Sequence, residues 1–209
     1  MPTLEELIQC GLSPSQIGQQ ALQDETLLRT LFTGIAPQKQ KKEVRENCSQ
    51  ALLFLSQQHP QILLPYWEQF TALLPCGNGF SQYVAVHALA NLSAADQGAR
   101  MQADLGAFLA LLDSPSVMVA GHTAAAAGQV AAACPSLQAI ITERLLKTSA
   151  PERDAERAAL IVSYVLDAFD LYIEGNPQRE RMVGLAFSQI DCASPKTRKR
   201  AKQFLDRWG

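Results

Sequence analysis

The sequence predicts an all-α protein in which antiparallel helix pairs stack one after another. Apolar residues recur at helical spacing along most of the chain, whereas the alternating patterns typical of strands are short. Prolines stand where helices would begin, since proline is tolerated in the first helical turn. A segment of small and apolar residues recurs about every 37 residues, which favours a stacked array over a compact bundle.

Local signals place the individual helices. Serines precede prolines at 114–115 and 194–195 and are expected to cap the helices that follow. Thr3 and Glu6 have the spacing of a capping box, and Pro65 is expected to kink the helix around it. The predicted helices span 3–10, 13–22, 24–33, 38–58, 60–75, 80–94, 98–112, 115–133, 136–147, 152–174, 177–190 and 195–207.

The recurring segment is the first helix of each predicted pair. Small residues in each copy would let neighbouring helices approach closely, as in the alanine-rich run at 124–127. The copies begin near Val44, Ser81, Val119, Ala155 and Thr197. The second helices share an apolar stripe, formed by Leu63, Trp67, Phe70 and Leu74, then by Met101, Leu105, Phe108 and Leu112, then more weakly by Leu137 and Ile141, and by Met182, Ala186 and Ile190.

These repeats resemble HEAT repeats, within the wider armadillo-like superfamily. The Val44-Arg45 pair matches the start of a HEAT first helix, the stretch 87–93 resembles the armadillo version, and 112–117 resembles the loop between HEAT units. The resemblance implies a right-handed α-α superhelix with helical caps. It covers 38–209, as about four helix pairs plus a C-terminal capping helix in one continuous domain. Residues 1–37 do not fit the repeat and are interpreted as an N-terminal helical cap.

Composition excludes several classes of protein. The net charge is −2, which does not favour a polyanion as partner, and no apolar run reaches the roughly 18 residues of a membrane span. The five cysteines are too widely spaced for a zinc site, and no basic-then-apolar leader opens the chain, so reduced thiols in the cytoplasm are expected. His59, His87 and His122 lack acidic neighbours at helical spacing. We therefore predict no catalytic residue, no metal site, no cofactor and no enzymatic activity.

Second helices usually line the concave face of such an array, and residues beside their buried stripe are the candidate contacts. These candidates are Tyr66, Gln69, Asp104, Glu143 and Arg179. A second candidate is a basic face on the last helix, formed by Lys196, Arg198, Lys199, Arg200 and Lys202. That face can equally be the solvated side of a capping helix.

The mixed charge of the predicted concave face favours a protein or peptide ligand over nucleic acid. The leading interpretation is therefore a cytoplasmic, non-catalytic binding scaffold. Two alternatives remain open. One is a nucleic-acid-binding or DNA-base-repair protein of HEAT-like architecture, and the other is an accessory subunit of a lyase. The sequence does not predict the oligomeric state.

Overall fold

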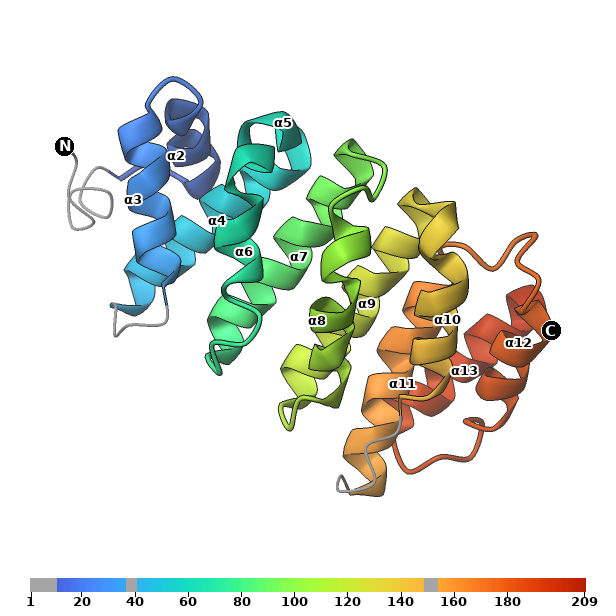
Figure 1. Cartoon of the computed structure of the whole chain (residues 1–209). Helices are drawn as coiled ribbons and strands as arrows, with labels where there is room; N and C mark the ends of the chain where they lie inside the picture. The colour runs from blue at the N-terminus through green and yellow to red at the C-terminus, as the bar shows by residue number, and fades with distance from the viewer. Residues whose placement is uncertain (1–10, 37–40, 149–153) are drawn as a thin grey trace. The chain divides into compact units, whose positions relative to one another are not determined.

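A computed structural model describes residues 11–36, 41–148 and 154–209, and these residues fold as helices joined by short turns (Figure 1). The chain divides into two compact units, Met1–Ala95 and Asp96–Gly209. The helix expected at 3–10, with its capping box at Thr3 and Glu6, lies outside the described residues. The division into a cap at 1–37 and one continuous repeat domain at 38–209 stays a prediction.

The first unit is a layered arrangement of short and long helices (Figure 1). The long first helices α4 and α7 pack against each other, and the shorter pieces pack on them. The buried side chains of the predicted stripe, from Leu63 to Leu74, close this core. In order, the elements are α2 (Pro14–Ala21), α3 (Glu25–Ile35), α4 (Lys42–Gln58), α5 (Pro60–Leu63), the 3-10 turn η1 (Leu64–Tyr66), α6 (Trp67–Thr71) and α7 (Gly79–Ala95).

The second unit continues the alternation of first and second helices. Figure 1 shows α8, α10 and α12 in one layer, and α9, α11 and α13 in the other. The elements are α8 (Met101–Ala110), η2 (Leu111–Asp113), α9 (Val117–Ala133), η3 (Pro135–Leu137), α10 (Gln138–Leu146), α11 (Ala155–Phe169), α12 (Arg179–Phe187) and α13 (Pro195–Trp208).

Local signals in the sequence set most helix starts and breaks. Pro65 interrupts the helix predicted over 60–75, which becomes α5, η1 and α6. Ser194 caps α13 as predicted, because its hydroxyl accepts the N–H of Thr197 at 3.4 Å. The prediction for Ser114 is wrong. Ser116 is itself a good cap residue, and its hydroxyl accepts the N–H of Val119 at 3.4 Å, so α9 begins two residues later than expected.

The closest helix packing in the second unit is between α9 and α11. A Cβ on Gly128 would lie 2.5 Å from both Cα and Cβ of Ala168. A Cβ on Gly121 would lie 2.7 Å from the ring of Tyr164. The alanines of this segment at 124, 126, 127 and 131 are fully buried. The prediction that the alanine-rich run serves tight packing within the array is confirmed.

Candidate binding surface on the second helices

In the first unit, an aromatic pair closes the surface between α3 and the second helix. Tyr66 lies in η1 and stacks on Phe32 of α3, with ring centroids 5.2 Å apart and an interplanar angle of 18°. The hydroxyl of Tyr66 donates to Glu25 Oε1 at 3.4 Å, and the same oxygen accepts from Arg29 at 2.7 Å. Tyr66 is therefore held by contacts within its own unit, and Gln69 of α6 is exposed.

Electrostatics in this cluster follow from the same contacts. The Arg29 guanidinium, through its hydrogen bond and its charge, lowers the pKa of the Glu25 carboxyl. Burial of the ring, together with the nearby Glu25 charge, raises the pKa of the Tyr66 hydroxyl. Both groups therefore stay in their ordinary ionisation states near neutral pH, and the cluster acts as a structural contact.

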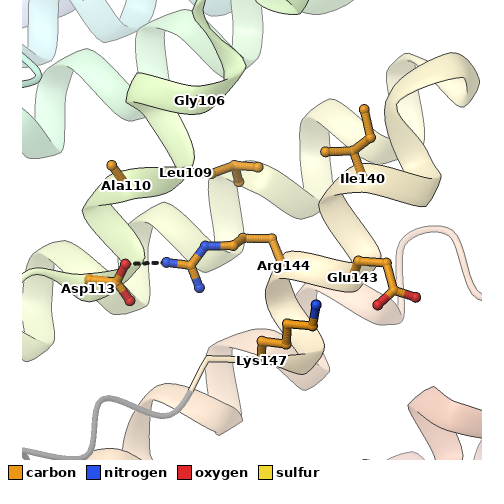
Figure 2. Close-up of a pocket in the computed structure, with 8 residues that line it drawn as sticks. All are labelled: Gly106, Leu109, Ala110, Asp113, Ile140, Glu143, Arg144 and Lys147. Atoms are coloured by element: carbon orange, nitrogen blue, oxygen red, sulfur yellow. Dashed lines mark hydrogen bonds and ion pairs between the residues drawn. The ribbon is translucent and has the colours of Figure 1, made fainter.

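In the second unit, the corresponding space between α8 and α10 is an open pocket of about 430 Å³ (Figure 2). Each helix contributes residues at positions i, i+3, i+4 and i+7, which lie on one face of a helix. The apolar part of the wall comes from Leu109, Ala110 and Ile140, and Gly106 exposes the backbone of α8. The full lining is Gly106, Leu109, Ala110 and Asp113 from α8 and η2, and Ile140, Glu143, Arg144 and Lys147 from α10 and its C-cap.

Ion pairs join the three second helices of this unit. Arg144 of α10 donates to Asp113 at the end of η2, across the pocket in Figure 2. Glu143 of α10 accepts from Arg181 of α12, and the hydrogen bond from Arg181 lowers the pKa of the Glu143 carboxyl. Each acid of the pocket is therefore paired with an arginine, although Arg181 does not line the pocket, and the charge of Lys147 also lowers the pKa of Glu143.

The structure places the predicted contact residues unevenly. Glu143 lines the pocket, whereas Asp104 is half-buried on α8 and does not line it. Arg179 donates to the backbone carbonyl of Trp208 and does not line the pocket. Sequence reasoning missed the pocket residues other than Glu143. An isoleucine at 140, directly beside the buried stripe at Ile141, was the available signal.

The basic side chains of the last helix divide into held and exposed groups. Arg200 is bound by Asp167 and Asp170 of α11, and Asp170 also accepts the indole N–H of Trp208. Lys196 lies over the ring of Tyr164, with Nζ 4.2 Å from the centroid. Arg198 donates to the carbonyl of Cys192 at 2.7 Å, whereas Lys199 and Lys202 are exposed.

Within 11–36, 41–148 and 154–209, no three His, Cys, Asp or Glu side chains gather as a metal site. In the same ranges, no helix combines the length and the apolar character needed to cross a bilayer. Cys48 and Cys134 are buried, and burial raises the pKa of the Cys48 thiol to about 12. Cys48 is therefore a packing residue, because a thiol of such high pKa is not nucleophilic near neutral pH.

Comparison with known proteins identifies the fold. The structure is similar to that of a designed armadillo repeat protein, YIII(Dq)4CqI, with a TM-score of 0.64 and 19% sequence identity. The match covers 99% of this chain and 92% of that one. No protein-family model matches the sequence, and no curated protein matches it. The likeness establishes the fold class: the chain is an all-α, armadillo-like helical repeat.

Proposed function

From this armadillo-like repeat fold, we propose that the chain is a non-catalytic scaffold that binds a protein or peptide on the second-helix surface of residues 96–209. The observation that supports the proposal best is the open pocket between α8 and α10. Ile140, on its wall, is 59% exposed, although it sits on a helix whose opposite face is well buried. Protein interfaces combine apolar contacts with a polar rim, and Ile140 with the ion pairs beside it supplies both.

The charges of this surface favour a protein over nucleic acid. A polyanion is bound through rows of unneutralised Lys and Arg side chains. Here Arg144 and Arg181 are neutralised by Asp113 and Glu143. The basic residues of α13 are also partly engaged within the chain, since Arg200 is held by two aspartates. The buried thiols at Cys48 and Cys134 support a reducing, cytoplasmic location as part of the same proposal.

A capture experiment with matched variants tests the proposal. Full-length chain is immobilised as wild type, as Asp104→Arg/Ile140→Glu on the second helices, and as Gln129→Glu on the exposed side of α9. Lysate of the source cells is passed over each, with and without nuclease. We expect a protein that is retained by wild type and Gln129→Glu, lost with the double variant, and unaffected by nuclease. Loss of retention after nuclease, or equal retention by all three chains, would contradict the proposal.

A further inference from the structure

Gly106 leaves the α8 wall of the pocket without a side chain, and packing inside the chain does not require a glycine there. A Cβ on Gly106 would have no neighbour within 4 Å, so no internal contact demands glycine there. A glycine inside a helix is less stable than an alanine at the same position. Gly128 of α9 is the opposite case, because a Cβ there would collide with Ala168. The space over Gly106 is therefore available to a group from outside the chain.

The α10 wall offers an apolar contact and a surplus charge on one face. Ile140 and Lys147 are seven residues apart, which is about 10 Å along a helix. Of the two charged residues between them, Glu143 forms an ion pair with Arg181 and Arg144 forms one with Asp113. Lys147 is exposed and forms no ion pair within the part of the chain that the structure describes, although its charge is near enough to lower the pKa of the Glu143 carboxyl. One wall of the pocket thus carries the apolar side chain of Ile140 and, about 10 Å further along the chain, the positive charge of Lys147.

The shape of the hollow decides between a small molecule and a side chain. Sites for small molecules bury most of the ligand surface. This pocket is open to solvent, and its walls come from the exposed faces of two neighbouring helices (Figure 2). Such a hollow covers one side of an apolar group and leaves the rest exposed. It suits a side chain that is held in place by the remainder of a longer segment.

We infer that the pocket takes one apolar side chain of an extended peptide segment that also carries an Asp or Glu for Lys147. An extended chain covers 10 Å in about three residues, so the acid should stand about two to four positions from the apolar residue. The inference rests on the proposed function and adds the chemical class of the partner. Gly106 is the specificity-determining position, because any side chain there would occupy the hollow.

Selection of peptides tests the inference. The full chain is panned against a phage library of random peptides, and the affinities of enriched synthetic peptides are measured by calorimetry. We expect enriched sequences to pair Leu, Ile, Met or Phe with Asp or Glu at the stated spacing. Gly106→Leu should weaken their binding by about tenfold or more, because the leucine fills the hollow. Lys147→Met should weaken it by about threefold to tenfold.

Gly184→Leu is the matched control. Gly184 is an exposed helical glycine of α12 that also has no neighbour within 4 Å of a Cβ, but it does not line the pocket. Its variant should keep the affinity, and both leucine variants should melt no lower than wild type. Enriched peptides that bind Gly106→Leu as tightly as wild type would overturn the inference and leave the proposed function standing. Enrichment of basic peptides would overturn it as well. Failure to enrich any peptide would count against both.

Discussion

The same repeat position is half-buried in the first unit and exposed in the second. In the register of the apolar stripe, Trp67 corresponds to Ile141, so Tyr66 corresponds to Ile140. Tyr66 stacks on Phe32 and is half-buried by that contact. Ile140 faces the small residues Gly106 and Ala110 across a pocket and remains exposed. The same repeat position therefore carries a stacked side chain in the first unit and an exposed side chain beside a pocket in the second.

The difference shows that the fold alone does not determine where such a repeat has an open pocket. Both positions lie beside buried residues of a second helix, and both helices pack on long first helices. What differs is the side chain supplied by the neighbouring helix, an aromatic ring in α3 and a glycine in α8. In this chain the pocket lies where α8 carries Gly106, and substitutions that add or remove a side chain at such positions test the contrast.

The largest effect is expected from the close packing of α9 and α11, which supports the open layer of the second unit. Gly128→Ala places a Cβ 2.5 Å from Ala168, and relief of that overlap must separate the helices. We expect a loss of about 2 to 3 kcal/mol in the free energy of unfolding by urea. Gly184→Ala, at an exposed helical glycine, should not lose stability. Equal effects of the two substitutions would contradict the packing contrast.

Removal of the aromatic ring should open the surface of the first unit. Tyr66→Ala loses the stack on Phe32 and is expected to cost about 1 to 2 kcal/mol of unfolding free energy. Tyr66→Phe keeps the ring and loses only the hydrogen bond to Glu25, so it should stay within about 0.5 kcal/mol of wild type. If both variants lose the same stability, the hydroxyl contact is the important one and the stack is not.

Gly106→Ala should stabilise the second unit. Its Cβ meets nothing within 4 Å, and alanine favours the helix over glycine by about 0.5 to 1 kcal/mol. A rise in Tm of about 1 to 4 °C is expected by calorimetry. A lower Tm would mean that Gly106 is required by the fold, which would remove the main reason to assign it to a partner.

The smallest effect concerns His122 on α9. Burial of the ring and the charge of Lys196 lower the pKa of His122 below its ordinary value of 6.5. The unfolded chain therefore takes up this proton first, so the contribution is complete above pH 6.5 and is lost as the pH falls from 6.5 through the folded pKa. The urea midpoint of wild type should fall between about pH 7.5 and pH 5.5.

Two substitutions assign that pH dependence. His122→Gln should flatten it over this range, and Lys196→Gln should flatten it partly, because the lysine charge is the second of the two causes. Glu25 and Glu143, whose pKa values are lowered, lose their contributions only below about pH 4.5. An unchanged slope in His122→Gln would show that His122 does not carry the effect.

The fold was accessible from the sequence because its signals are local and repeated. Pro65 and Ser194 act through the backbone groups of their own turns, and the stripe from Leu63 to Leu74 recurs at a fixed interval. The candidate site was accessible only in part. Glu143 was predicted as a contact, but its pairing with Arg181 was not, because that pairing depends on how α10 packs against α12.

The pocket itself could not be predicted, since its existence depends on two helices about 35 residues apart. Ile140 and Gly106 line the pocket from different helices, and nothing local to either residue shows that they come together. The predicted binding roles of all five contact residues, Tyr66, Gln69, Asp104, Glu143 and Arg179, and of the basic residues of α13, stay predictions.

Charge reversal across the pocket tests the central claim most directly. A peptide selected on wild type is measured against Lys147→Glu, and the same peptide with its acid changed to lysine is measured against both chains. We predict that each single reversal weakens binding by about tenfold and that the double reversal restores most of the loss. Weakening by both changes without any recovery would contradict the account, because Lys147 would then not face the acidic residue of the bound segment.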